Sequence, residues 1–473
     1  MDIDTRTALV NALVYAPFST ALPLPFRVIL LGGSGLLAWA TNLHFLYLLG
    51  IDTSFALDFR IADKSAFAHP ATLHGPIYRL FVAYSAWAFT GWVFFRAVTA
   101  GGQDSLDGWK PVPTIVLIGI LIAVFIPFNV LSLRERVAFR QAVKRCLLSP
   151  YSQPIFFSDV ILADIFTSFA KVIGDLWLST AMLLPSGSLK SLPVFEGLWE
   201  WAVPCMMSLP YAIRFRQCIV EYIGSGRKNP NSVANAIKYA TAFPVIFLSA
   251  MQIIPEGYDD VDVGKSKWRR DNNLWRLWIL SVAINSLYSF WWDVTNDWGL
   301  TLLRRPGMPL ILLPPTPYSL SRPGTPLPSS PHLSPLAQST FGRLHPATPP
   351  YGLRNQMLFP DTLMYYLAIA LNLVLRCTWS LKLSAHLHSL AQLEHGIFIM
   401  EALEILRRWV WVFFRVEWEV VKKMRARDAA GYGPVATNDP DDIPMRASLR
   451  RSASPPGLLG VHTHGNGNGY LSS

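Results

Sequence analysis

Charged residues are scarce in this sequence. Only 15% of its 473 residues are Asp, Glu, Lys or Arg, and 51% are hydrophobic, whereas a soluble domain usually has about 25% charged residues. A surface this poor in charge is typical of a protein surrounded by lipid, so the composition argues against a soluble domain. The basic residues lie in short loops and near the C-terminal end and form no continuous stripe, which argues against nucleic-acid binding.

Paired cysteines and a basic N-terminal region are also lacking. The four cysteines are scattered without CxxC spacing, which indicates small buried side chains and neither a metal site nor a disulfide framework. The first residues, MDIDTRTALV, contain no basic region followed by an apolar stretch, so we expect no cleavable signal peptide. Membrane insertion then depends on the first spanning helix.

Long apolar segments, in contrast, are abundant. A spanning helix needs about 20 mostly apolar residues, and three almost uncharged segments of this kind cover residues 27–50, 77–99 and 112–132. Six further apolar segments contain ionisable residues: 157–184, 197–222, 232–254, 273–302, 361–384 and 393–418. The sequence therefore predicts an all-α, polytopic transmembrane helical bundle of about nine spans.

The distribution of charge among the loops predicts the topology. If nine spans alternate, the segments rich in Arg and Lys lie on one side with the C-terminal tail, and positive residues mark the cytosol. These segments are 133–154, 223–231 and 303–360. We therefore expect a lumenal N-terminal segment and a cytosolic C-terminus.

Composition divides the chain into regions. The predicted regions are a lumenal segment 1–26, N-terminal transmembrane helices 27–150, a second transmembrane domain 151–427 and a tail 428–473. A cytosolic insertion, 304–351, is dense in Pro and Ser, and the tail is rich in Gly, Ser and Asp. Both are predicted to be disordered because their composition cannot maintain a helix or a core.

Ionisable residues inside the predicted spans provide the functional signal. A charged side chain at the centre of a bilayer costs about 2.5–3.5 kcal/mol on insertion scales, so we expect these residues to face the interior of the bundle. In the fourth span, helical spacing places Asp164, Thr167, Lys171 and Asp175 on one stripe. The alternative is that Lys171 and Asp175 pair with each other and only join helices.

Three other spans repeat this pattern. Arg214 shares a face of the fifth span with Gln217 and Glu221, whereas Arg216 points elsewhere. Lys238 lies in the sixth span, where it either lines a path or extends to the nearby interface. Asp293 and Asp297 are four residues apart at the end of the seventh span, so they lie on one face.

The ninth span contains the densest cluster of charges. Glu404 can reach Arg407 or Arg408, which are three and four residues later. The two arginines project about 100° apart, so one of them needs another partner. With Arg376 in the eighth span, the cations at membrane depth are Lys171, Arg214, Lys238, Arg376, Arg407 and Arg408. Cations from several helices are suited to binding an oxyanion, because guanidinium groups bind oxyanions through paired hydrogen bonds.

Several segments of the chain resemble the EXS family. They are LADIFTSFAKVIGDL, LPYAIRFRQCIVEY, NPNSVANAIKYATAF, LYSFWWDVTNDWGL, LNLVLRCTWSL and LEILRRWVWVFFRVEWE, in one order over about residues 155–420. The resemblance implies a path for inorganic phosphate in the lipid bilayer. The residues that match its lining are Asp164, Arg214, Lys238, Tyr239, Asp293, Arg376, Trp379, Glu404, Arg407 and Arg408. We expect Thr167 and Asp297 to line the same path.

The chain departs from part of that family. Thr167 and Ala170 stand where the phosphate-exporter branch has Asn and Ser. That branch also has a cytosolic SPX domain and an additional first helix, for which the 26 residues before the first span leave no room. The arrangement is similar to the Golgi branch, which implies a multi-pass Golgi protein that can cycle with the ER. The branch is associated with phosphate return after glycosylation, with glycosyltransferase recycling and with retention of lumenal ER proteins.

Other functions remain open at this stage. One alternative is a sorting or retention receptor that does not transport and that binds coat or glycosyltransferase-sorting adaptors through its basic loops and tail; a homodimer is also left open. A membrane-embedded transferase or hydrolase is a weaker alternative, because His386 and His388 have no adjacent carboxylate pair and Asp293 and Asp297 are too few for a compact metal motif. We expect no catalytic residues, no metal and no cofactor.

Overall fold

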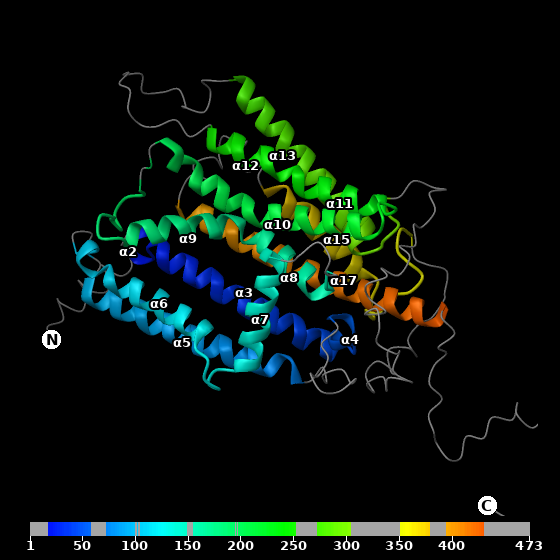
Figure 1. The fold of residues 1–473 in the computed structure, drawn as a ribbon, viewed down its shortest axis with the longest axis horizontal. Coiled ribbons are helices and arrows are strands. Elements are labelled where there is room, and N and C mark those ends of the chain that lie inside the picture. The colour runs from blue at the N-terminus through cyan, green and yellow to red at the C-terminus, as the bar shows by residue number, and fades with distance from the viewer. Residues whose placement is uncertain are drawn as a thin grey trace, which may run out of the picture. The chain divides into compact units, whose positions relative to one another are not determined.

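The computed structural model describes residues 18–57, 72–99, 102, 105–148, 155–193, 195, 197–251, 272–303, 351–378 and 394–429. Every regular element among these residues is a helix, which confirms the predicted all-α class. The chain separates into two units, Met1–Ala430 and Gly431–Ser473, and the described residues all belong to the first (Figure 1). The predicted disordered insertion, apart from its last residue, and nearly all of the predicted tail lie outside the described residues.

Each of the predicted spans corresponds to helical structure. The elements are α3 (Leu24–Leu48), α5 (His74–Thr99), α6 (Pro111–Phe125), α8 (Phe157–Ser168) and α9 (Ala170–Leu183), η3 (Gly197–Trp201) and α10 (Ala202–Gly224), α11 (Pro230–Ala240) and α12 (Ala242–Met251), α13 (Asn272–Trp292) and the π-turn η5 (Asp293–Asp297), α15 (Leu363–Arg376) and α17 (Glu394–Ala429). Short helices α2 (Phe18–Ala21), α4 (Thr53–Leu57) and η2 (Asp107–Trp109) connect them.

Three helical segments of the described chain are long and apolar enough to cross a membrane by length and composition. They are Leu24–Leu48, Asp107–Phe125 and Pro230–Met251. The outward face of α6 carries large exposed apolar side chains that no described element covers, namely Ile115, Ile118, Leu121, Ile122 and Phe125. An apolar surface of this kind is suited to contact with lipid, so the structure supports a membrane protein. The predicted total of about nine spans stays a prediction.

The basic segment 133–154, which the topology treats as a loop, contains a helix. This helix, α7 (Leu133–Leu148), runs across the direction of α3 and α5 (Figure 1). Arg136 explains how the chain turns before it, because its guanidinium group donates hydrogen bonds of 2.6–3.0 Å to main-chain carbonyl groups between Ala123 and Leu131. One arginine thus satisfies carbonyl groups that the end of α6 leaves free.

Prolines determine where several helices begin. Pro111 and Pro230 are the first residues of α6 and α11, positions that require no backbone N–H donor. Asn229 caps α11, since its side chain accepts a hydrogen bond of 3.2 Å from the backbone N–H of Asn231. Helix α6 ends at Phe125, two residues before Pro127, which cannot continue it.

Helix α17 organises the largest apolar core. It contacts α3, α4, α8, α15 and η5, and its Trp411 packs in a buried cluster with Trp298 and Tyr365. A second anchor is ionic: Arg354, just after the Pro-rich insertion, pairs with the fully buried Glu417 of α17. Helix α17 therefore brings its charged residues beside α8, α15 and η5, which contain the polar motifs of the other spans.

Candidate functional site

The polar motifs coincide with interruptions of the helices. Regular helix geometry is interrupted at Phe169, between α8 and α9, and at Thr241, between α11 and α12. The residues after α13 form a single π-turn. In that turn the N–H of Trp298 donates to the carbonyl of Asp293 at 2.9 Å. Turns of this kind are common at functional sites, and irregular backbone at membrane depth is tolerated where it lines a cavity or is buried in protein.

Asp293, which is fully buried, is the centre of the site. Lys238 of α11 donates to one carboxylate oxygen at 3.0 Å, and Arg376 of α15 donates to the other at 2.5 and 3.1 Å. Asn372 donates to this second oxygen at 3.2 Å, and Arg407 of α17 lies 3.6 Å from it. Cations from three helices therefore converge on a single carboxylate.

Lys238 joins Asp293 to Asp297. Its ammonium group also donates to Asp297 at 3.0 Å, and its side chain is only 5% exposed. The alternative in which Lys238 extends to the interface is therefore wrong. Both aspartates lie on one face, as their spacing predicts, and Arg415 of α17 lies 3.8 Å from Asp297.

Asp164 of α8 forms the second buried ion pair of the site. Arg214 of α10 donates to it at 2.9 Å, and the Tyr239 hydroxyl group donates to the same oxygen at 2.5 Å. Arg214 also donates to Gln217 at 2.5 Å and lies over the Tyr239 ring. The predicted face of α10 is thus confirmed for Arg214 and Gln217.

The two adjacent arginines of α17 separate as their geometry predicts. Arg407 donates to both carboxylate oxygens of Glu404, at 2.5 and 2.8 Å. Arg408 turns to the break after α8, where it donates to Ser168 at 2.9 Å and to Thr167 at 3.0 Å. The Ser168 hydroxyl group also contacts Glu404, to which it donates at 2.8 Å.

Some predicted residues lie elsewhere. Lys171 forms an ion pair with Asp175 within α9 and does not join the central cations, because α8 and α9 are separate helices and the predicted single stripe is interrupted. Arg216 points away from the site and donates to the Leu147 carbonyl at 2.9 Å. Trp379 lies outside the described residues.

The charges of the site do not cancel. The central cations are Arg214, Lys238, Arg376, Arg407 and Arg408, and the carboxylates are Asp164, Asp293, Asp297 and Glu404. Among these nine side chains, five cations face four carboxylates, which leaves one positive charge in excess; Arg415, which borders Asp297, is itself paired with Glu419. Arg408 is 6% exposed, and its buried Nη1 has no hydrogen-bond acceptor among the residues that the structure describes. The arrangement therefore offers a donor and a net positive charge to an anion.

Comparison with known proteins agrees with these motifs. The EXS family model matches residues 22–421. The chain belongs to the EXS family. It is 30% identical to Protein ERD1 homolog 1 of Schizosaccharomyces pombe over 90% of this chain and 98% of that protein, and 26% identical to Protein ERD1 homolog 2 over 85% and 97%. It is also 25% identical to human Solute carrier family 53 member 1, over 65% of this chain and 39% of that protein.

Three residues of this EXS site were not among the sequence-based candidates. Ser168 bridges Glu404 and Arg408, and Asn372 bridges Asp293 and Arg407. Helical spacing contained a signal for Asn372, which lies one turn before Arg376 on α15. Arg415 carried a similar signal, because it follows Arg408 by seven residues, or two turns of α17.

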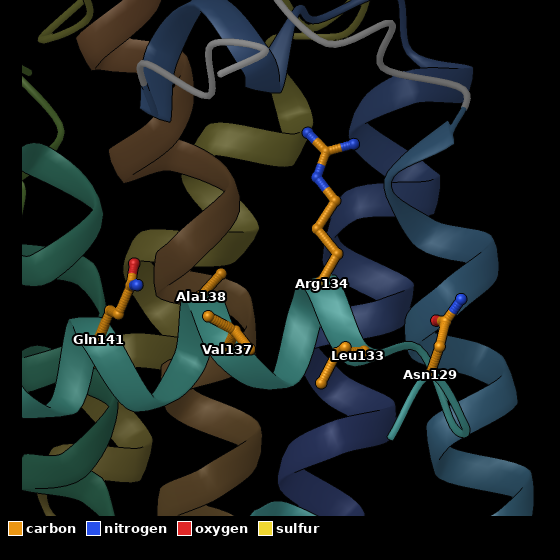
Figure 2. Close-up of a pocket in the computed structure, with 6 residues that line it drawn as sticks. All are labelled: Asn129, Leu133, Arg134, Val137, Ala138 and Gln141. Carbon is orange, nitrogen blue, oxygen red and sulfur yellow. The ribbon is translucent and has the colours of Figure 1, made fainter. Parts of the chain in front are cut away.

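Two surface grooves of the EXS chain lie apart from these residues. One is lined by residues of α7 and the segment before it, including Asn129, Arg134 and Gln141 (Figure 2). The other lies at the turn between α10 and α11, and the residues that line it include Arg227 and Lys228. Neither groove contains a residue of the predicted path.

Metal binding is not supported by the described part of this EXS chain. No three His, Cys, Asp or Glu side chains gather there in a way that would bind a metal ion. Asp293 and Asp297 are instead occupied by Lys238. His386 and His388 lie outside the described residues.

Proposed function

We propose that this EXS-family chain exports inorganic phosphate from the Golgi lumen to the cytosol. The observation that carries the proposal is the convergence of five cations from α10, α11, α15 and α17 on four carboxylates, with one positive charge in excess. Burying unpaired charges costs several kcal/mol each. A protein retains so many buried charges in a membrane bundle when they serve a polar substrate.

The donor chemistry fits phosphate. Hydrogen phosphate presents four oxygens and two negative charges, and guanidinium groups bind such oxygens through pairs of hydrogen bonds. The unpartnered Nη1 of Arg408 is available to a phosphate oxygen without any bond being broken. Arg376 and Arg407 can exchange Asp293 and Glu404 for phosphate.

The carboxylates allow bound phosphate to leave the cations of the site. Conduction requires binding that is favourable enough for entry and weak enough for exit. Asp293 and Glu404 already bind the cations that phosphate would need, so they compete with it and limit its affinity. This competition favours a channel or uniporter over a tight binding protein.

The location in the cell is part of the proposal. About nine spans with a cytosolic C-terminus place the N-terminus of α17 toward the lumen. The similarity to the ERD1 homologues over nearly their full lengths supports the SPX-less branch, for which we expect a Golgi membrane. Phosphate return there would support glycosylation, glycosyltransferase recycling and retention of lumenal ER proteins.

Efflux from proteoliposomes tests the proposal. Purified protein is reconstituted in vesicles loaded with phosphate, and efflux is compared for wild type, Arg214→Ala and Arg216→Ala. The two arginines are two residues apart on α10, but only Arg214 belongs to the site, so Arg214→Ala should lose efflux and Arg216→Ala should retain it. Wild-type efflux no faster than that of protein-free vesicles would reject transport and leave the sorting-receptor alternative.

A further inference from the structure

The surface groove at the turn between α10 and α11, here called the α10–α11 groove, combines two cations with an apolar wall. Its volume is about 540 Å³. The residues that line it include Tyr222, Arg227, Lys228, Pro230, Val233 and Ile237. Arg227 and Lys228 are exposed, and Ile237 is 49% exposed. The groove therefore has a basic end and an apolar side that are both open to the surroundings of the protein.

The apolar wall belongs to the outer face of α11. Val233 and Ile237 are four residues apart, so they project to the same side of the helix. Lys238 and Tyr239, in contrast, are buried and project toward the rest of the bundle. The helical segment Pro230–Met251 is long and apolar enough to cross a membrane. The wall is thus the beginning of a face that is suited to contact with acyl chains.

The basic end lies at the depth of phospholipid headgroups. Arg227 and Lys228 come just before Pro230, where the apolar segment begins, and cations next to a spanning segment attract anionic lipids. The predicted topology places segment 223–231 on the cytosolic side, where the membrane surface is negatively charged. No acidic side chain is among the described residues that line the groove. Its two positive charges are therefore not balanced within it.

The backbone at Arg227 is unusual for an arginine. Its φ angle is +64°, in the left-handed region that is costly for a residue with a Cβ atom. The backbone N–H of Arg227 donates to the Tyr222 carbonyl at 3.0 Å and so closes the end of α10. Glycine is the usual residue at such a position. A residue retained in a strained conformation points to a function, which here belongs to the guanidinium group.

We propose that the α10–α11 groove binds an anionic phospholipid. Arg227 and Lys228 bind the phosphate of the headgroup, and an acyl chain lies along Val233 and Ile237. A free phosphate ion would use only the cations, and a lipid without net charge would leave the two positive charges unbalanced. The charge and the apolar wall together therefore select an anionic amphiphile. The groove contains no residue of the central site, so this inference does not depend on phosphate export.

Lipid binding in detergent tests the groove without any transport measurement. The purified full chain is titrated with phosphatidylserine or with phosphatidylcholine of the same acyl chains, and bound lipid is counted by native mass spectrometry. Wild type should prefer phosphatidylserine. Each cation near the headgroup contributes roughly fivefold to affinity, so Arg227→Gln/Lys228→Gln should bind phosphatidylserine about thirtyfold more weakly than wild type. Equal affinity of wild type for the two lipids would overturn the proposal.

A matched double variant separates the groove from diffuse attraction of anionic lipids. Arg134→Gln/Lys144→Gln removes the same charge from exposed positions of α7, and Arg134 lines the other groove (Figure 2). This variant should bind phosphatidylserine as wild type does. Equal losses in the two double variants would show that the lipid follows overall charge, which would overturn the α10–α11 groove as a site.

Two further measurements test the apolar wall. Ile237→Asn retains both cations but makes the wall polar, so it should bind phosphatidylserine more weakly than wild type. Glycerol 3-phosphate, which has the anionic phosphate without acyl chains, should not displace phosphatidylserine at an equal concentration. Unchanged binding by Ile237→Asn, or displacement by glycerol 3-phosphate, would assign the groove to a small anion and overturn the lipid.

Replacing Arg227 by Gly separates lipid binding from folding. Glycine adopts a positive φ angle readily, so the variant without added lipid should unfold at a temperature no lower than that of wild type. Its affinity for phosphatidylserine should nevertheless fall roughly fivefold. If the folded variant binds phosphatidylserine as tightly as wild type does, Arg227 is not part of the site and the proposal fails. A lower unfolding temperature would assign the arginine a structural role and would also count against the proposal.

Discussion

Lys238 donates hydrogen bonds of 3.0 Å to both Asp293 and Asp297, across the π-turn that ends α13. One ammonium group from α11 thus compensates two carboxylates that are four residues apart on another element. The π-turn brings both carboxylates toward the same cation. This relationship links the irregular backbone of the site to its charge balance.

Replacing Lys238 by Met tests that link. The substitution keeps the length of the side chain but leaves two buried carboxylates with fewer cations, and removing one member of a buried ion pair costs about 3–5 kcal/mol. We expect a lower free energy of unfolding and a loss of phosphate efflux. Lys238→Arg should retain more of both, and equal thermal stability of Lys238→Met and wild type would contradict the role of the bridge.

Replacing Arg408 by Lys tests the guanidinium geometry. Lysine keeps the charge and has three N–H donors, but they sit on one nitrogen and cannot be spread over Ser168, Thr167 and a phosphate oxygen as the planar guanidinium fork can. A hydrogen bond to a charged group contributes about 1.5–3 kcal/mol, so we expect phosphate affinity, measured from the concentration dependence of flux, to fall roughly 10- to 100-fold. Unchanged affinity would show that charge alone suffices at this position.

Replacing Asn372 by Asp tests the excess positive charge. A carboxylate there would cancel that charge and place a second negative group beside Asp293, to which Asn372 now donates. We expect phosphate efflux to fall while Asn129→Asp, at an exposed position of the groove in Figure 2, leaves efflux unchanged. Efflux at the wild-type rate in Asn372→Asp would show that the net charge of the site does not govern transport.

Replacing Gly299 by Ala tests the turn after the π-turn. Gly299 has a φ angle of +65°, and a Cβ atom there would collide with the Trp418 ring of α17. The left-handed backbone alone costs about 1–2 kcal/mol for a residue with a Cβ atom. We expect a clearly lower temperature of unfolding in detergent. An unchanged temperature would mean that the turn at Gly299 and helix α17 can move apart without loss of stability.

Deleting residues 431–473 separates transport from sorting. All described residues of the site lie in the unit Met1–Ala430, so we expect the truncated protein to export phosphate from vesicles at the wild-type rate. If the tail binds a sorting adaptor, the same truncation should displace the protein from the Golgi in cells. Loss of efflux in folded, truncated protein would contradict the first expectation, and unchanged location would argue against sorting through the tail.

The sequence by itself determined the helical class, the approximate positions of most helices and the identity of nearly all the central charges, whereas α7 and the interruptions at Phe169 and Thr241 were not predicted. Helical periodicity also predicted the local relationships, such as the separation of Arg407 from Arg408 and the shared face of Asp293 and Asp297. These predictions are confirmed because spacing along a helix fixes the direction in which each side chain projects. The EXS motifs added Tyr239 to this set, and its contact with Asp164 agrees with them.

Only the tertiary structure decided which cation meets which carboxylate. Lys238 bonds to Asp293 and Asp297, while Arg408 bonds to Ser168 and Thr167, and these residues are separated by about 55 to 240 positions in the chain. Their pairing depends on how helices pack and where they are interrupted, as at Phe169 between α8 and α9. Local spacing contains no information about packing between helices, because it describes each helix alone.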